Sequence, residues 1–433
     1  MAFDRRNFLQ RLAATGAAVA AGSFFQTLEG QALQEQLQAA RHRSTADITP
    51  DEEFWYWVKQ AYTVSPTILN LNNGGVSPQP RVVQEAVERY NRLSNEAPSY
   101  YMWRILDKGR EPLRARLADL AGVSPEEIAI QRNSSEALET IIFGLRLQPG
   151  DEVVLAKQDY PNMINAWKQR AHRDGIVLKW VNLDLPLEDE DFIVGKYVEA
   201  FSPRTRIVHI THIINWMGQI LPAQRIAREA HQRGIEVVVD AAHSFAHLDF
   251  QIPDLDCDYF GTSLHKWLCA PFGSGMLYVK KDKIKNLYPL LAAPDPEADD
   301  IRKFEALGTR SFAIEQAIGQ AIDFHELIGT ERKQQRLHYL KSWWTDRVKD
   351  LPVIRIGTSL DPRFSCAIAL LQVEGKTPKE VHDYLFNRHK IHTVPINWEN
   401  IHGVRVTPNV YTTTKDLERL VEAIHQLQKN GSG

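Results

Sequence analysis

The chain has 433 residues, of which 43% are hydrophobic and 24% are charged, a balance typical of a globular protein with room for more than one domain. A formal net charge of -3 gives no basis for nucleic acid or an anionic membrane as a partner. Three cysteines are too few for a disulfide framework or a zinc cluster, so we expect Cys257, Cys269 and Cys366 to be buried thiols.

The N-terminal 40 residues have the pattern of a targeting segment. Arg5 and Arg6 precede an apolar run of small residues, 12–25, as in a twin-arginine export signal, which the translocase reads and which is usually removed. This run is too short and too rich in Ala and Gly for a stable membrane span. The alternative is a basic cap on an ordinary amphipathic helix. We predict a periplasmic protein exported in folded form, with a cut near residues 30–32, and exclude residues 1–40 from the fold.

Residues 41–66 are predicted to form a separate N-terminal segment, a polar lead-in followed by an aromatic helix at 54–58. A short strand at 68–71 then ends in an Asn-Asn-Gly-Gly turn. Apolar residues at helical spacing predict a helix over 80–93 and a second over about 108–121.

From residue 127 strands and helices alternate. The apolar runs predict strands at 128–130, 153–155, 177–181, 205–213, 235–240, 259–260 and 275–279, and helices at 134–142, 163–173 and 223–233. Such alternation is typical of an α/β fold with a mostly parallel sheet covered on both faces, and we assign residues 67–300 to this large domain.

The remaining chain is predicted to form a connection and a smaller domain. Long helices at 312–327 and 331–349 make residues 301–350 a connecting segment. Residues 351–429 are predicted to form a small α+β domain, with strands at 367–371 and 403–406 and helices at 378–387 and 416–427. The tail, 430–433, has the composition of a frayed end.

Two residues carry the chemistry. Asp240 ends a buried apolar run, and Lys266 lies in a loop rich in Ser, His and Gly. A pyridoxal 5'-phosphate (PLP) enzyme needs this pair, because the lysine forms the Schiff base and the acid keeps the pyridine nitrogen protonated. The alternatives are an exposed loop lysine and a carboxylate that caps a helix.

Around these residues the chain resembles the class V aminotransferase family of fold-type I PLP enzymes, and within it the isopenicillin-N-epimerase-like branch. The resemblance covers residues 69–427. It includes Ser263-Leu264-His265-Lys266, Asp240-Ala241-Ala242-His243 and the segment Arg132-Asn133-Ser134-Ser135 that begins a helix. A helix N-terminus with free N–H groups suits a dianionic phosphate.

The resemblance implies a role for each matching residue. Lys266 forms the Schiff base and moves the α-proton, Asp240 pairs with the ring nitrogen, and His243 lies near the ring hydroxyl. The other residues that it assigns to the cofactor are Ser134, Ser135, Ser263 and His265 at the phosphate, Tyr160 stacked on the ring, and Asn215 at the ring hydroxyl or the substrate.

The resemblance also implies substrate and subunit contacts. Arg405 binds the substrate carboxylate through a bidentate pair, with Asn72 and Tyr101 (or its neighbour Tyr100) beside the substrate. Thr309, in Phe304-Glu305-Ala306-Leu307-Gly308-Thr309, reaches the phosphate of a neighbouring subunit, which implies a homodimer with shared sites. The segment has one residue more than some relatives, which puts the placement of Thr309 in doubt.

Several histidines are candidate metal ligands by their spacing. His243 and His247 have the i, i+4 spacing of helical ligands, but no third ligand accompanies them, so we expect no metal. His209 and His212 lie on one predicted strand and point to opposite faces, which favours packed histidines.

The motifs do not select the reaction. Our first hypothesis is an aminotransferase-like enzyme acting on an amino acid or amine, and the alternative is an epimerase or lyase. A protein that keeps the fold without catalysis is a third reading, against which the intact Asp240, Lys266 and Arg405 argue. Cysteine desulfuration is disfavoured, because no cysteine lies between 387 and 405, where desulfurases carry their nucleophile.

Overall fold

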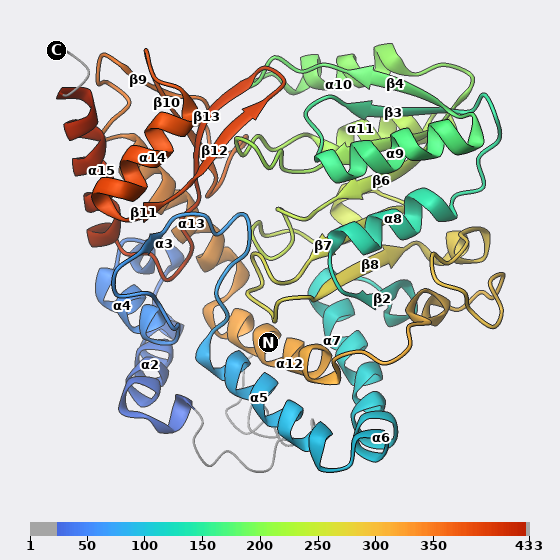
Figure 1. Ribbon diagram of the computed structural model, residues 1–433, viewed down its shortest axis with the longest axis horizontal. Helices are drawn as coiled ribbons and strands as arrows, with labels where there is room; N and C mark the ends of the chain where they lie inside the picture. The colour runs from blue at the N-terminus through green and yellow to red at the C-terminus, as the bar shows by residue number, and fades with distance from the viewer. Residues whose placement is uncertain (1–23, 430–433) are drawn as a thin grey trace.

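The large domain is built on a seven-stranded sheet with the strand order β2-β8-β7-β6-β5-β3-β4 (Figure 1). Neighbouring strands from β7 to β4 are parallel, whereas β8 is antiparallel to both β2 and β7. The strands are β2 (Ile128–Gln131), β3 (Glu152–Ala156), β4 (Val177–Val181), β5 (Thr205–Thr211), β6 (Glu236–Asp240), β7 (Tyr259–Ser263) and β8 (Gly275–Val279). The computed structural model describes residues 24–429.

Helices cover both faces of this sheet, as a mostly parallel sheet requires. Along β3, Val153 and Leu155 join one apolar cluster with α8 and α9, while Val154 and Ala156 join another on the opposite face. The expected α/β class is therefore confirmed. The helices of this domain are α5 (Arg81–Glu96), α7 (Arg110–Ala121), α8 (Ser134–Gly144), α9 (Pro161–Asp174), α10 (Glu190–Ala200), α11 (Ala223–His231) and α12 (Phe312–Ile328).

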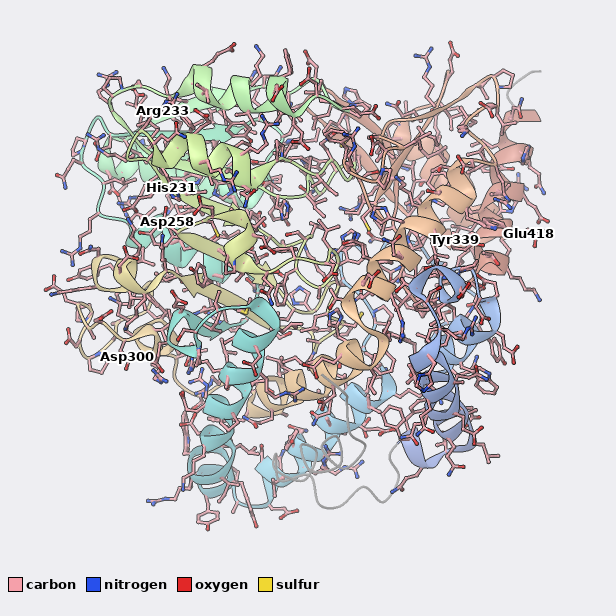
Figure 2. All side chains as sticks on the ribbon, turned by 180° about the vertical axis from the view of Figure 1, so that it is seen from behind. His231, Arg233, Asp258, Asp300, Tyr339 and Glu418 are labelled. Carbon is pink, nitrogen blue, oxygen red and sulfur yellow. The ribbon has the colours of Figure 1, made fainter. Side chains whose placement is uncertain are left out.

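The C-terminal domain has an antiparallel sheet of its own, in the order β12-β13-β10-β9, with a separate apolar cluster. Seen from behind, Tyr339 and Glu418 mark α13 and α15, which pack together at this domain (Figure 2). Its elements are β9 (Ile354–Ile356), β10 (Ala369–Val373), β12 (Val394–Trp398), β13 (Ile401–Val406), α13 (Thr330–Thr345), α14 (Pro378–His389) and α15 (Thr414–Lys429). A two-stranded parallel sheet of β1 (Leu69–Asn70) and β11 (Ile391–His392) joins this domain to the early chain.

The segment before residue 41 contains folded structure, which corrects the exclusion of the first 40 residues. Thr27 caps α2 (Leu28–Ala39) through the N–H of Gly30, and Leu33 and Leu37 are buried in the main apolar cluster. A Cβ at Gly30 would collide with the backbone of Phe24, itself buried. A cut near residues 30–32 would therefore divide a packed helix. The twin-arginine motif and the tail 430–433 lie outside the described residues.

The remaining elements are short connections. Within residues 24–429, no helix is both long and apolar enough to cross a bilayer. The connections are η1 (Phe24–Gln26), η2 (Ala40–His42), α3 (Thr45–Ile48), α4 (Glu52–Gln60), α6 (Pro98–Tyr100), the π-helix η3 (Tyr101–Leu106), η4 (Asp107–Gly109), η5 (Pro125–Glu127), η6 (Ile252–Leu255), η7 (Lys281–Asn286) and η8 (Ile301–Glu305).

Candidate active site

The candidate site lies at the carboxyl ends of the parallel strands, beside the C-terminal domain (Figure 1). Asp240 is the last residue of β6 and Ser263 the last of β7, and Lys266 follows three residues later. The carboxyl ends of parallel strands meet at one edge of a sheet, where α/β proteins bind their ligands. Strand β13 brings Arg405 to the same edge.

Lys266 is held beside two buried groups. Its Nζ lies 3.1 Å from Nε2 of His243. Burial lowers the pKa of Lys266 to about 8; the carboxylate of Asp240 opposes this change, and Arg405 adds to it. About a tenth of Lys266 is therefore a free amine at pH 7, the form that acts as a nucleophile and proton carrier.

Asp240 is buried and accepts a single described hydrogen bond, 2.9 Å from the N–H of Ala242 to its Oδ1. Burial raises its pKa, while the Ala242 N–H and Lys266 favour the charged form. Among residues 24–429 no donor is recorded for its Oδ2. That oxygen is free to accept a hydrogen bond from a protonated ring nitrogen.

The start of α8 makes an anion site with the end of β7. The N–H of Ser134 donates to Oγ of Ser263 at 2.9 Å, and that hydroxyl donates to Oγ of Ser134, also at 2.9 Å. The N–H of Ser135 has no recorded partner within the described part of the chain. His265 lies alongside, and its Nδ1 is bonded at 3.0 Å to the carbonyl of Ser274.

A close backbone approach shapes this anion site. Gly275 begins β8 directly against Asn133, and a Cβ there would lie 2.6 Å from the backbone of Asn133. Asn133 in turn caps α8 through the N–H of Glu136. The hydroxyls and N–H groups of this site are therefore set by a contact that only glycine permits.

Arg405 is a buried cation whose recorded bonds are to neutral acceptors. Its Nη1 donates to the carbonyl of Asn215 at 2.8 Å and its Nη2 to Oδ1 of Asn72 at 3.0 Å. Burial lowers the pKa of Arg405 to about 10, whereas the hydroxyl of Tyr160 acts to raise it. Its Nε is buried and has no hydrogen-bond partner among residues 24–429, so this N–H is available to an anionic ligand.

Tyr160 and Asn215 complete the set at this edge. Tyr160 precedes α9 and is 38% exposed, with its ring centroid 6.4 Å from that of Trp216. Asn215 is buried, and its Oδ1 has no hydrogen-bond partner within residues 24–429. A half-exposed ring and an unsatisfied amide oxygen are what an aromatic ligand with a hydroxyl group would use.

Each of the available polar groups at this edge matches one group of PLP. Asp240 Oδ2 suits the pyridine nitrogen, Asn215 Oδ1 the ring hydroxyl, and the start of α8 the phosphate. Lys266 suits the aldehyde and Arg405 a substrate carboxylate.

Two predicted residues lie apart from this cluster. Tyr101 opens the π-helix η3, packs its ring against Tyr100, and has no recorded contact with Lys266 or Arg405 in the described chain. Its helix packs against α5 and α12 rather than at the ends of the strands. The structure therefore does not bring Tyr101 to the substrate position within one chain.

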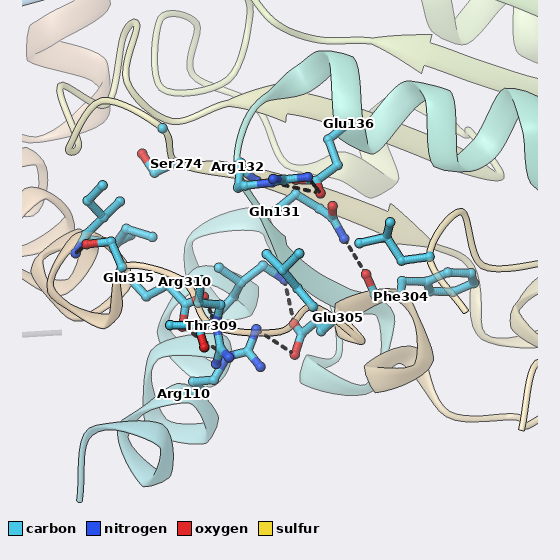
Figure 3. A pocket seen from close by; sticks show the side chains of 17 residues that line it. Arg110, Gln131, Arg132, Glu136, Ser274, Phe304, Glu305, Thr309, Arg310 and Glu315 are labelled. Atoms are coloured by element: carbon cyan, nitrogen blue, oxygen red, sulfur yellow. Dashed lines mark hydrogen bonds and ion pairs between the residues drawn. The ribbon is translucent and has the colours of Figure 1, made fainter. Parts of the chain in front are cut away.

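Thr309 lies on the outer side of the phosphate loop. It is exposed, and it lines a cavity of about 260 Å³ together with Arg132 and Ser274 (Figure 3). The preceding Glu305 is buried and anchors the segment, pairing with Arg114 at 2.6 Å and accepting the N–H of Ile130. Thr309 has no recorded bond to the phosphate residues of its own chain.

Other titratable groups at the site were not predicted from the sequence. Asp159, next to Tyr160, is fully buried and accepts from the hydroxyl of Thr211 at 2.7 Å and from the N–H of Ala156 at 2.8 Å. Burial raises its pKa to about 7, and the nearby charge of Asp240 adds to this. The only sequence signal was its place beside Tyr160.

The histidines have packing partners. Burial lowers the pKa of His209 and of His212 to about 4, and His209 accepts from the indole of Trp167. Both ring nitrogens of His247 are hydrogen-bonded to backbone groups. No group of three potential metal ligands occurs among residues 24–429.

Comparison with known proteins identifies relatives over most of the chain. The sequence profile of the family described as aminotransferase class-V matches residues 68–420. The isopenicillin N epimerase of Amycolatopsis lactamdurans is 29% identical over 87% of this chain and 99% of its own length. A probable cysteine desulfurase of Synechocystis is 30% identical over 63% of this chain and 69% of its own length.

Solved structures show the same fold. A complex of the cystine C-S lyase C-DES with cysteine persulfide superposes with a TM-score of 0.76 at 21% identity, covering 82% of this chain and 97% of that chain. The likeness shows the fold-type I arrangement of a large α/β domain and a separate C-terminal domain.

Proposed function

The chain belongs to the class-V aminotransferase family, and from this premise we propose that it is a PLP-dependent enzyme acting at the α-carbon of an amino acid through Lys266. One observation carries the proposal. The buried Arg405, held by neutral oxygens and without a carboxylate partner, lies at the same strand edge as Lys266. A free α-carboxylate would satisfy this guanidinium through a bidentate pair.

The chain's own residues supply binding, orientation and proton transfer. PLP, when bound, serves as the electron sink for the bond broken at the α-carbon. Asp240 would hold the ring nitrogen, and the start of α8 with Ser263 and His265 would hold the phosphate. Lys266, whose pKa is lowered to about 8, would take the α-proton and return it.

Transamination is the first form of the proposal, because one base on one face of the ring is sufficient for it. The Nζ of Lys266 would take the proton from the substrate α-carbon and would return a proton from the same Nζ on the same face. Asn72 and the backbone of Asn215 hold Arg405 so that the carboxylate, and with it the α-hydrogen, has a defined orientation.

Epimerisation is the second candidate, and the two epimerase relatives favour it, each matched over 98% or more of its own length. Inversion requires a proton donor on the face opposite Lys266. Tyr160, whose ring the family resemblance stacks on the cofactor ring, is the residue we assign to this task. An electrostatic interaction between Tyr160 and Arg405 supports the assignment.

Cysteine desulfuration gains no support from the geometry. Residues 394–406 form the hairpin of β12 and β13, which contains no cysteine. The three cysteines are buried, and burial raises the pKa of Cys366 to about 12. A buried thiol with a raised pKa is a poor nucleophile.

Two wider features belong to the proposal. The exposed position of Thr309 next to the phosphate loop supports a homodimer in which this residue reaches the partner's cofactor; light scattering of the holoenzyme measures its mass. Arg5 and Arg6 support folded export by the twin-arginine route, which allows the cofactor to be loaded before translocation.

The function is tested with a panel of amino acids in D2O. We expect the purified protein to take up PLP and to give Lys266 as the modified residue after borohydride reduction. A substrate should gain deuterium at its α-carbon. A keto acid product identifies transamination, and the inverted amino acid without keto acid identifies epimerisation.

Two variants separate the roles. Lys266→Ala should lose nearly all turnover, whereas Lys379→Ala, on the exposed side of α14, should keep it. Tyr160→Phe should abolish inversion while leaving deuterium exchange by Lys266. Failure to bind PLP, or full turnover by Lys266→Ala, would refute the proposed function.

A further inference from the structure

The ring of His243 is bonded at both nitrogens. The indole Nε1 of Trp267 lies 3.4 Å from Nδ1 of His243, and the Nζ of Lys266 lies 3.1 Å from its Nε2. An indole N–H only donates, so Nδ1 must be the unprotonated nitrogen that accepts. A neutral His243 then carries its single proton on Nε2, directed at Lys266.

The surroundings of His243 keep it neutral. Burial lowers its pKa, and the charges of Lys266, Arg405 and His247 act in the same direction. No carboxylate among residues 24–429 is among the groups that shift the pKa of His243, and Asp240, at the end of β6, acts on the neighbouring Lys266 instead. His243 therefore faces Lys266 as a neutral donor.

Trp267 is fixed in place by a second histidine. Its ring stacks on His247 with centroids 3.7 Å apart and planes inclined by 19°. Nδ1 of His247 donates to the carbonyl of His243 at 2.7 Å, and its Nε2 accepts the N–H of Ala367 at 3.0 Å. Lys333 donates to the carbonyl of Trp267 from behind. The indole is fully buried and cannot turn its N–H elsewhere.

We propose that Trp267 is a positioning residue that fixes the tautomer of His243, so that Nε2–H donates to Nζ of Lys266 and holds the lysine as a free amine. A donor facing Nζ stabilises the amine, which has a lone pair, and gives nothing to the ammonium, which has none. The reverse tautomer would present a lone pair to Lys266 and stabilise the ammonium instead. The catalytic consequence rests on the proposed function, but the tautomer itself does not.

The tautomer is measured directly in the full-length protein labelled with ¹⁵N in its histidine rings, with His243→Gln used for assignment. We expect the wild-type His243 to show a protonated Nε2 and an unprotonated Nδ1. A proton on Nδ1 in the wild-type protein would overturn the proposal without any variant at Trp267.

Trp267→Phe keeps an aromatic ring over His247 and removes only the N–H. We expect a mixture of His243 tautomers and a rate of PLP uptake at pH 7 that falls about tenfold, as for one unit of pKa at Lys266. The uptake rate should recover at higher pH. Trp344→Phe, which removes a buried indole from the C-terminal domain, is the matched control and should leave both measurements unchanged.

The outcomes separate this proposal from the proposed function. A folded Trp267→Phe protein with an unchanged His243 tautomer and an unchanged pH profile contradicts the positioning role. If the wild-type protein takes up no PLP, the proposed function fails, while the ¹⁵N spectrum of the unloaded protein still decides the tautomer.

Discussion

Arg405 shows how one residue links the sequence to the substrate class. A buried arginine without an acidic partner is costly, because its charge has left water for a few neutral acceptors. Here those acceptors are an asparagine side chain and a backbone carbonyl, which orient the guanidinium without neutralising it. Under the proposed function, the carboxylate of the substrate would pair with this charge.

The lowered pKa of Lys266 predicts the pH dependence of cofactor uptake. Uptake requires the free amine, whose fraction rises with pH until the pH exceeds the pKa. With a pKa of about 8, the rate should rise about tenfold between pH 7 and 9 and then level off. Stopped-flow absorbance after mixing the unloaded protein with PLP measures the rate.

The control for this measurement is the reaction of PLP with a blocked lysine, which should keep accelerating up to about pH 10.4, the ordinary pKa of lysine. If the protein followed the same course as the blocked lysine, the Nζ of Lys266 would not be desolvated as the structure indicates.

At the scale of elements, the contact of β8 with the start of α8 predicts a sharp effect of one methyl group. In Gly275→Ala the new Cβ would lie 2.6 Å from the backbone of Asn133, which cannot move without shifting the cap of α8. We expect a loss of about 1–3 kcal/mol in the free energy of unfolding, the usual cost of overpacking, and weaker PLP binding.

Thermal unfolding and equilibrium dialysis with PLP measure these two effects. Gly195→Ala in α10 is the matched control, since a Cβ there meets nothing within 4 Å and alanine favours a helix. Unchanged PLP affinity in Gly275→Ala would mean that the start of α8 does not hold the phosphate.

Two strands of the large sheet could be predicted closely from the sequence, whereas the C-terminal sheet could not. Strands 177–181 and 275–279 were predicted with the observed bounds, because each is a short run of mainly apolar residues. Strand β12 was missed. It contains Pro395, which argues against a central strand, but β12 is at the edge of its sheet, where proline is tolerated.

Parts of the candidate site were equally difficult to predict from the sequence. Asp240 and Lys266 come together because the ends of β6 and β7 meet at one edge of the sheet, a consequence of the fold class. Arg405 joins them from β13 of the C-terminal domain, through its hydrogen bond to Asn215. The hydrogen bond from the indole of Trp267 to His243 could not be predicted from the fold class. The i, i+4 spacing of His243 and His247 led to no metal prediction because no third ligand accompanies them, and it did not reveal that His247 stacks on the indole of Trp267.

At the scale of the whole molecule, the two domains meet at the substrate position. Arg405 comes from the C-terminal domain and donates to the carbonyl of Asn215 in the large domain. It also donates to Asn72, which follows β1, the early strand that pairs with β11. Three distant parts of the chain therefore hold one guanidinium. The cluster exists only when both domains are folded and in contact.

The N-terminal segment belongs to this assembly, and it limits where an export signal could be removed. Phe24 is buried, its N–H donates to Glu85 of α5 at 2.9 Å, and the guanidinium of Arg81 lies over its ring. Leu33 adds a fully buried side chain from α2. Truncating one such leucine typically costs about 2–5 kcal/mol.

We therefore predict that an exported form of this protein begins before Phe24, and not near residues 30–32. Mass spectrometry of the N-terminal peptide from a periplasmic fraction measures this position. A chain that starts at Phe24 should unfold at the temperature of the full-length protein, because it keeps every described element. A chain that starts at residue 41 should unfold at a clearly lower temperature, because α4 and α5 lose the apolar surface that Phe24, Leu33 and Leu37 cover. Equal stability of the two truncated chains, or a mature N-terminus after Gly30, would show that this segment is not part of the functional fold.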